Sequence, residues 1–436
     1  MEKNSIETRQ KTVGVIGLGY VGLPLIIQFG KAGFPTVGLD LDQGKIDRLI
    51  QGESYIKHIP SADIQALNGN RKVRWTTNFS IVSELDFILI CVPTPLNNNR
   101  EPDLKYIIST ANQISPHLVK GKKQIIILES TTYPGTTQEI LIPALEKSSN
   151  LKEGEDFFTA YSPEREDPNN KEFSTATIPK VIGSDSDYGL AASKQLYLSI
   201  LKEVVPVSDS RTAEATKLME NIFRSVNIAL VNELKTIFDK MGIDVWEVID
   251  AAKTKPFGFM PFYPGPGLGG HCIPIDPFYL TWKAREFGVT TRFIELAGEI
   301  NVAMPDYVVQ KILLALNSIK KSINGSRIII LGMAYKKNVD DARESPSYKI
   351  MDILTQQGCI VDYNDPYIPV LGEKRDYPQF VGKKEVPLEN LNQYDVTLIL
   401  TDHSSYDYKE IVERSNIVID TRNACAGIQS DKILKA

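Results

Sequence analysis

Residues 12–40 of the chain read TVGVIGLGYVGLPLIIQFGKAGFPTVGLD. The apolar runs at its two ends, Thr12–Ile16 and Thr36–Asp40, have the length and composition of β-strands. The segment between them, Val21–Ala32, has helical spacing and is followed by Gly33, the residue type that most often caps a helix C-terminus. A strand, a helix and a second strand in this order predict a parallel sheet covered by helices.

The turn between the first strand and the helix carries the pattern Gly-x-Gly-x-x-Gly at Gly17, Gly19 and Gly22. In a dinucleotide-binding fold the first two glycines allow a tight turn and the approach of a pyrophosphate, and the third packs helix against strand. The anion then lies at the helix N-terminus, where unpaired N–H groups and the dipole favour negative charge. Asp40 ends the second strand and is placed to bind the adenosine ribose, which favours NAD over NADP. A glycine-rich turn that binds nothing and a flavin site are the alternatives.

The alternation of strands and helices continues along the chain and returns near its end. Further strands are expected at Phe87–Val92, Gln124–Glu129, Thr159–Tyr161, Arg327–Leu331, Ile360–Asn364, Val396–Leu400 and Ile417–Asp420. A long helix, a loop rich in proline and glycine, and a second helical stretch are expected at Arg211–Met241, Pro256–Pro277 and Tyr279–Ile319. The predicted fold is α/β: two Rossmann-like domains, residues 1–208 and 319–436, joined by a helical middle domain, residues 209–318, with a long central helix.

Composition and charge limit the class of protein. Hydrophobic residues make up 42% and charged residues 24% of the 436 residues, as in soluble globular proteins. The net charge of −5 argues against broad electrostatic capture of nucleic acid or of an anionic membrane. The four cysteines, Cys91, Cys272, Cys359 and Cys425, form no CxxC pair, so neither a zinc site nor a disulfide framework is expected. With no signal peptide pattern and no apolar run of membrane-spanning length, we expect a cytoplasmic protein without a bound metal.

Three further segments contain residue types suited to catalysis. A cysteine lies in a glycine-flanked loop in Gly269–Asp276, Lys217 and Asn221 lie one turn apart on the long helix, and Ser162–Arg165 follows a strand end. Each has an ordinary structural interpretation as well. A free cysteine is more often a small buried hydrophobe than a nucleophile, a lysine and an asparagine at this spacing usually face solvent, and Glu164 could cap a helix.

Taken together and in order, these segments resemble one family along nearly the whole chain. The motifs are Gly17–Gly22, Cys91-Val92-Pro93-Thr94-Pro95, Glu129-Ser130-Thr131, Ser162-Pro163-Glu164, Glu214-x-x-Lys217-x-x-x-Asn221, Gly269-Gly270-His271-Cys272, Lys336 to Arg343-Glu344-Ser345-Pro346, and Asp420-Thr421-Arg422-Asn423. They resemble the UDP-glucose/GDP-mannose 6-dehydrogenase family. Within it, the loop around the cysteine resembles the subgroup that acts on UDP-N-acetylhexosamines, and UDP-N-acetylglucosamine is the substrate it favours.

The resemblance departs from the enzymes that oxidise UDP-glucose. Those enzymes typically have serine before the cysteine and lysine three residues after it, where this chain has His271 and Ile275. An arginine that they lend to a neighbouring subunit's sugar site would fall near Pro256 and is absent. UDP-N-acetylmannosamine and UDP-glucose remain alternatives for the substrate.

The family implies a four-electron oxidation of the sugar C6 hydroxyl that consumes two NAD⁺ and supplies a uronic acid for surface polysaccharide synthesis. Cys272 would attack the intermediate aldehyde to give a thiohemiacetal and then a thioester, which water hydrolyses. Lys217 and Asn221 would stabilise the thiolate and the oxyanions, and Glu164 would activate the water. Asp276 and Thr131 would hydrogen-bond to Lys217 or to a bound water.

The resemblance also implies two sets of binding residues. The cofactor-binding residues would be Gly17, Gly19, Tyr20, Val21, Gly22, Asp40, Lys45, Thr94, Thr132 and Arg343. The substrate-binding residues would be Glu164, Arg165, Lys217, Asn221, Gly269, Lys336 and Arg422, with the basic side chains suited to the diphosphate. The C-terminal domain would then bind the UDP-sugar.

Two rival functions share the fingerprint. A two-electron dehydrogenase of the 3-hydroxyacid or 6-phosphogluconate type has a helical middle domain with a catalytic lysine, but it needs neither the cysteine loop nor a second α/β region. A non-catalytic NAD-sensing protein would have no need of Cys272, Lys217, Asn221 and Glu164 together. The long helix also predicts a homodimer or a larger homo-oligomer.

Overall fold

The computed structural model of the chain separates into two compact units. Unit 1 comprises Met1–Glu220 and Phe278–Val289, and unit 2 comprises Asn221–Pro277 and Thr290–Ala436. The residues that the structure describes are 10–56, 59–70, 72–97, 101–165, 177–270, 273 and 275–436. The boundary falls inside the long helix, so the finer division into three domains stays a prediction.

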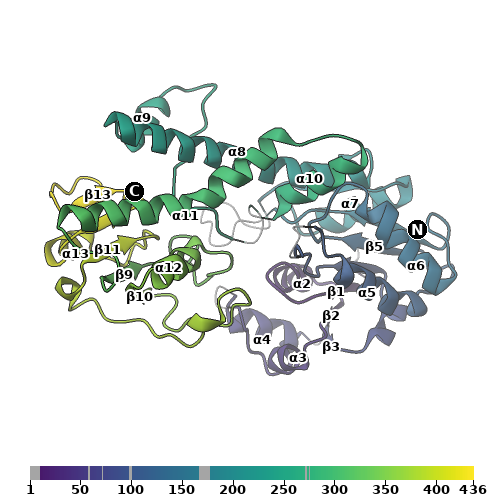
Figure 1. Cartoon of the computed structure of the whole chain (residues 1–436). Helices are drawn as coiled ribbons and strands as arrows, with labels where there is room; N and C mark the ends of the chain where they lie inside the picture. The colour runs from purple at the N-terminus through teal and green to yellow at the C-terminus, as the bar shows by residue number, and fades with distance from the viewer. Residues whose placement is uncertain are drawn as a thin grey trace. The chain divides into compact units, whose positions relative to one another are not determined.

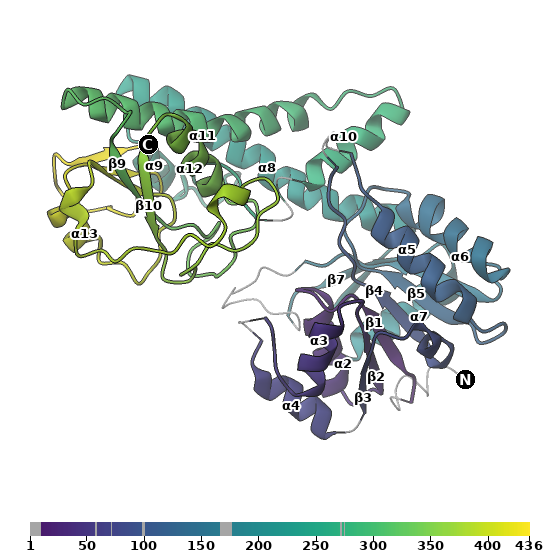
Figure 2. The same ribbon diagram turned by 60° about the horizontal axis from the view of Figure 1, so that its bottom comes forward.

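Unit 1 contains an eight-stranded sheet with the order β3-β2-β1-β4-β5-β6-β7-β8 (Figures 1 and 2). The strands are β1 (Val13–Ile16), β2 (Thr36–Leu39), β3 (Val73–Thr76), β4 (Phe87–Ile90), β5 (Gln124–Leu128), β6 (Phe157–Tyr161), β7 (Lys180–Gly183) and β8 (Val204–Val207). Neighbouring strands are parallel except β6 and β7, which are antiparallel. The predicted parallel sheet is confirmed.

Helices cover both faces of this sheet. The helices of unit 1 include α2 (Gly22–Lys31), α3 (Gln43–Ile50), α4 (Ser61–Gly69), α5 (Lys105–Ile114), α6 (Ile142–Ser149) and α7 (Asp187–Leu198), with short helical turns η1 (Phe79–Glu84), η2 (Ser115–His117) and η3 (Thr137–Leu141). Because strand side chains alternate between faces, Val13 and Val15 pack with α2 and α7 in one core, and Ile16 packs with α5 and α6 in another. Gly33 has φ +93°, and it ends α2 as predicted.

Unit 2 contains a five-stranded parallel sheet with the order β10-β9-β11-β12-β13. Its strands are β9 (Arg327–Leu331), β10 (Ile360–Asn364), β11 (Val396–Ile399), β12 (Val418–Asp420) and β13 (Ile433–Lys435). Its helices are α9 (Val245–Ala252), α11 (Arg292–Ser318), α12 (Pro346–Gln356) and α13 (Tyr408–Arg414), with turns η4 (Pro378–Phe380) and η5 (Leu391–Gln393). Helix α11 packs beside α12 (Figure 1).

The long central helix is confirmed as α8 (Ser210–Met241). The stretch expected to be helical from Tyr279 to Ile319 is two helices, α10 (Asp276–Glu286) and α11, which are interrupted where Gly288 adopts φ +69°. Sequence patterns missed β3, β7, β8 and β13, because each contains a charged residue or a proline and is not a continuous apolar run. Among the described residues, no helix is long and apolar enough to cross a membrane.

Candidate functional site

The glycine fingerprint forms the turn from β1 to α2. Gly17 has φ +89°, and a Cβ there would lie 2.5 Å from the Cys91 carbonyl oxygen. A Cβ on Gly22 would overlap the Gly17 carbonyl. A Cβ on Gly19, in contrast, would meet no described atom within 4 Å. The outer glycines are therefore required for packing, whereas Gly19 leaves open backbone at the N-terminus of α2, as a bound pyrophosphate needs.

Asp40 lies directly after β2 and faces this turn. Its Oδ2 accepts hydrogen bonds from Leu18 N at 2.9 Å and from Lys45 Nζ at 3.2 Å, and its Oδ1 accepts one from Asp42 N at 3.0 Å. A carboxylate offers about four acceptor positions, so Asp40 can also accept ribose hydroxyl groups. Lys45 and Asp40 form an ion pair, so the two predicted cofactor-binding residues lie next to each other. These residues fit a dinucleotide without a 2′-phosphate.

The loop after β5 carries the predicted Thr131 and Thr132. Thr94 Oγ1 donates to Thr131 O at 2.7 Å, so the structure brings two predicted site residues together. Thr132 is fully buried. The hydroxyl of Tyr279, on α10, donates a hydrogen bond to Thr94 O. Thr94 is therefore bonded both to the loop after β5 and to α10.

Glu214 ties the same loop to α8. Its carboxylate accepts hydrogen bonds from Gly135 N at 2.6 Å and from Thr137 N at 2.9 Å. Burial raises the pKa of Glu214 to about 7, although these hydrogen bonds oppose the shift. Because Lys217 lies one turn further along α8, this contact sets its position relative to the threonine loop. Glu214 belongs to a motif of the sequence, but its hydrogen bonds to the loop after β5 could not be predicted from that motif.

Lys217, Glu164 and Arg165 lie together in unit 1. Lys217 is buried, and its ammonium donates a hydrogen bond to the Glu164 main-chain oxygen. Arg165 donates to Pro179 O at 2.5 Å and forms an ion pair with Glu220 at 2.6 Å. The loop after β6 is therefore held to α8 by a lysine and an arginine.

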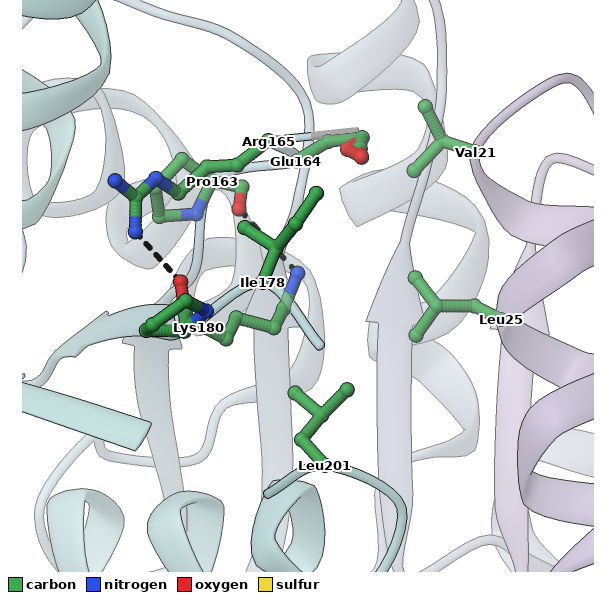
Figure 3. A pocket seen from close by; sticks show the side chains of 9 residues that line it. Val21, Leu25, Pro163, Glu164, Arg165, Ile178, Lys180 and Leu201 are labelled. Carbon is green, nitrogen blue, oxygen red and sulfur yellow. Dashed lines mark hydrogen bonds between the residues drawn. The ribbon is translucent and has the colours of Figure 1, made fainter. Parts of the chain in front are cut away.

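A pocket next to this loop brings the predicted water-activating residue close to the fingerprint helix (Figure 3). It is lined by Val21, Leu25, Pro163, Glu164, Arg165, Ile178, Pro179, Lys180 and Leu201. Its walls are apolar apart from Glu164, Arg165 and Lys180 (Figure 3). Val21, a predicted cofactor residue, thus shares a pocket with the predicted residues Glu164 and Arg165.

In unit 2, Asn221 and Asp276 form one contact. Both side chains are buried, and Asn221 Nδ2 donates to Asp276 Oδ2 at 2.5 Å. Asp276 was expected to bond to Lys217 or to a water, so its hydrogen bond to Asn221 is a finding of the structure. The predicted nucleophile Cys272 and its neighbour His271 lie outside the described residues.

The glycine-rich segment that leads to Cys272 packs against basic residues of unit 2. A Cβ on Gly265 would lie 2.6 Å from Arg422 Nη1, and a Cβ on Gly269 would lie 2.6 Å from Tyr335 Cβ. Gly270 N donates to Arg343 O at 3.1 Å. Glycine is therefore required at Gly269, where the loop approaches the segment after β9, whereas a side chain at Gly265 would have to displace the Arg422 guanidinium.

The remaining predicted binding residues also have defined places. Lys336 is half-buried and adjoins Tyr335 in the segment after β9. Arg343 lies in unit 2 and pairs with Asp341 at 2.6 Å. The nucleotide fingerprint is in unit 1, so the role of Arg343 as a cofactor contact stays a prediction.

Comparison with known proteins assigns the three parts of the chain. Residues 11–201 match the NAD binding domain of the UDP-glucose/GDP-mannose dehydrogenase family, residues 211–303 match its central domain, and residues 329–427 match its UDP binding domain. The UDP-N-acetyl-D-glucosamine 6-dehydrogenase of Pseudomonas aeruginosa is 36% identical over 90% of this chain and 91% of its own length.

Two further relatives carry the names of other sugars. The NDP-N-acetyl-D-galactosaminuronic acid dehydrogenase of Ralstonia nicotianae is 33% identical over 96% of this chain and 97% of its own. The solved structure of a UDP-D-ManNAc dehydrogenase from Pyrococcus horikoshii is 30% identical, with a TM-score of 0.87 over 97% of this chain and 98% of that one. The relatives therefore share a reaction type and differ in the sugar.

Proposed function

The chain belongs to the UDP-glucose/GDP-mannose dehydrogenase family of NAD-dependent UDP-sugar 6-dehydrogenases, and we propose that it oxidises UDP-N-acetylglucosamine to the corresponding uronic acid. One observation carries the proposal. In the NAD-binding unit, the Lys217 ammonium donates a hydrogen bond to the Glu164 main-chain oxygen. The N-acetylated sugar is supported by His271 and Ile275, and by the names of the relatives. The product would serve surface polysaccharide synthesis.

The chemistry that we propose uses residues of this chain at each step. NAD⁺ held by the fingerprint and Asp40 would supply the hydride acceptor for both oxidations, while a base takes the proton of the hydroxyl that is oxidised. The Cys272 thiolate would attack the aldehyde carbon to form a C–S bond, and Lys217 and Asn221 would stabilise the negative oxygen that results. Glu164 would take a proton from water, which then displaces the Cys272 sulfur from the thioester.

Further residues would orient the catalytic side chains or bind NAD and the UDP-sugar. Asp276 would orient Asn221 through their hydrogen bond, and Thr131 would hold a water close to the reacting atoms. The substrate-binding residues would be Arg165, Gly269, Lys336 and Arg422, and the cofactor-binding residues would be those of the fingerprint with Asp40, Lys45, Thr94, Thr132 and Arg343. The guanidinium of Arg422 suits the oxygens of a diphosphate.

A substrate panel tests this function. With UDP-GlcNAc, UDP-ManNAc, UDP-GalNAc, UDP-Glc and GDP-Man, we expect the highest kcat/KM for UDP-GlcNAc. Two NADH should form for each sugar oxidised, because the oxidation from alcohol to acid removes four electrons. NADH absorbance and product mass measure both quantities. A stable ratio of one NADH per sugar would instead favour the two-electron hydroxyacid type of dehydrogenase.

Replacing Asp40 with asparagine is expected to weaken NAD⁺ binding about 10-fold or more, since hydrogen bonds to a charged group contribute about 1.5–3 kcal/mol. Removal of the negative charge should also lower the KM for NADP⁺. Asp42→Asn is the matched control, because Asp42 caps α3 through its side-chain oxygen and asparagine caps equally well. Titration of both variants with NAD⁺ and NADP⁺ checks the prediction, and an unchanged preference for NAD⁺ would contradict it.

We also propose that the protein forms a homodimer through α8. Its side chains Phe223, Leu230 and Ile237 are 47%, 50% and 44% exposed and recur every seven residues. Such spacing places them on one face of the helix. A second copy of α8 would cover this apolar face. The cytoplasmic location stays a prediction.

A further inference from the structure

Lys180, which lines the pocket that contains Glu164, forms a buried ion pair with Glu129. Lys180 Nζ is 2.7 Å from Glu129 Oε2, and the Glu129 side chain is fully buried. Tyr197, also fully buried, donates its hydroxyl to the other oxygen of Glu129. These three residues come from β7, from the end of β5 and from α7. Sequence reasoning assigned none of them a role.

The ammonium of Lys180 also contacts the loop that carries Glu164. Lys180 Nζ donates to Pro163 O at 3.3 Å, and Figure 3 draws this bond between two of the residues that line the pocket. Lys180 and Glu164 both line the pocket. Ser162 Oγ donates to Val181 O at 2.9 Å and joins the same loop to β7 one residue further along. The loop is therefore attached to the strand that carries the buried lysine.

We propose that Lys180 is a positioning residue for Glu164, holding its loop through the hydrogen bond to the Pro163 main-chain oxygen. This inference rests on the role proposed for Glu164. A hydrogen bond from a charged donor is stronger than one between neutral groups, so the ammonium holds this carbonyl firmly. Glu129 keeps the lysine charged in this buried place, because an unpaired buried ammonium would lose its proton.

The ionisable groups around Lys180 agree with this assignment. Burial alone would lower the pKa of Lys180, but Glu129 and Glu164 together raise it. Burial raises the pKa of Glu129, against the opposing effect of Lys180. Burial also raises the pKa values of Tyr197 and Cys91 well above their ordinary range, so both stay neutral. Lys180 is thus the cation of a cluster with two carboxylates.

Among the described residues, two further charged groups contact this loop from α8. Lys217 donates to the Glu164 main-chain oxygen, and Glu220 pairs with Arg165 of the loop. The Arg165 charge is therefore directed toward Glu220. Lys180 approaches the described part of the loop from the sheet.

The test uses Lys180→Met, which removes the charge and keeps an apolar side chain of similar length. Lys180→Arg restores a positive charge. Because Lys180→Met leaves Glu129 buried without its cation, the double variant Lys180→Met/Glu129→Gln removes both charges and protects the fold. Lys202→Met, at an exposed lysine, is the matched control. Tyr197→Phe removes a hydrogen bond and leaves the lysine charged.

With NAD⁺ and UDP-GlcNAc, the double variant is expected to release NADH in a burst and then to hydrolyse the enzyme-bound thioester at least about 10-fold more slowly than the unchanged protein. Formation of NADH in the burst should keep the rate of the unchanged protein, because the proposed role concerns hydrolysis alone. Lys180→Arg should restore the rate of hydrolysis, and Lys202→Met and Tyr197→Phe should keep it.

The outcomes separate this inference from the proposed function. If the unchanged protein forms neither NADH nor a thioester, the proposed function fails. If it forms both and the double variant keeps the hydrolysis rate of the unchanged protein, the positioning role of Lys180 is overturned. A loss of rate that slows the NADH burst as much as hydrolysis, and that arginine does not restore, would also overturn it, since that is the result of a structural defect alone.

Discussion

Replacing Cys272 with alanine is expected to stop acid formation, with a loss of kcat of about 10³-fold or more, while NAD⁺ still binds. The thiol is the group proposed to form the C–S bond to the aldehyde, and alanine offers no atom that can replace it. Cys272 is not among the predicted cofactor-binding residues, so cofactor affinity should be unaffected. Absorbance of NADH with UDP-GlcNAc and calorimetric titration with NAD⁺ measure the two quantities.

The other three cysteines provide matched controls. Burial raises the pKa of Cys359 to about 11, and burial together with Asp420 raises that of Cys425 to about 12. Burial also raises the pKa of Cys91 well above its usual range. Since the thiolate is the reactive form, these thiols should be inert near neutral pH. Cys359→Ala should keep full activity, and iodoacetamide should label Cys272 first. Full conversion to the uronic acid by Cys272→Ala would contradict the mechanism.

Much of the fold could be predicted because its signals are local. The turn from β1 to α2 needs glycine at fixed positions, and the buried parallel strands that were predicted are mostly continuous apolar runs. The strands β3 and β8 read VRWT and VVPV, in which an arginine and a proline interrupt the apolar run. Their place is set by pairing with neighbouring strands in the completed sheet.

Some residues of the site could likewise be predicted from the sequence and others could not. Lys217 and Asn221 are candidates through the resemblance to a family, because a lysine and an asparagine one turn apart usually face solvent. The pairing of Glu129 with Lys180 joins residues 51 positions apart, on strands that are not neighbours in the sheet. The sequence offered one signal for it, an acidic residue at the end of the otherwise apolar run QIIILE. A charge at the end of a buried strand has to be paired, but the chain does not say with which residue.

Replacing Glu164 with glutamine is expected to halt the reaction after the second oxidation. Glutamine has nearly the shape of glutamate and cannot accept the proton of the hydrolytic water, so kcat should fall by about 10²–10⁴-fold. The contact of Lys217 is to the Glu164 main-chain oxygen and is retained in this variant. Lys217 should therefore continue to support the chemistry at Cys272, and only hydrolysis should be slow.

The distinguishing result is a burst. Rapid mixing of the variant with NAD⁺ and UDP-GlcNAc should give two NADH per active site, followed by a slow steady rate. Mass spectrometry of the quenched protein should then find the sugar acyl group on the peptide that contains Cys272. Glu155→Gln is the control, because Glu155 is exposed and is not among the predicted site residues. A variant that turns over at the rate of the unchanged protein, with no covalent adduct, would assign the base to another residue. A variant that loses the burst as well would place Glu164 in an earlier step, because hydrolysis cannot limit the formation of the NADH that precedes it.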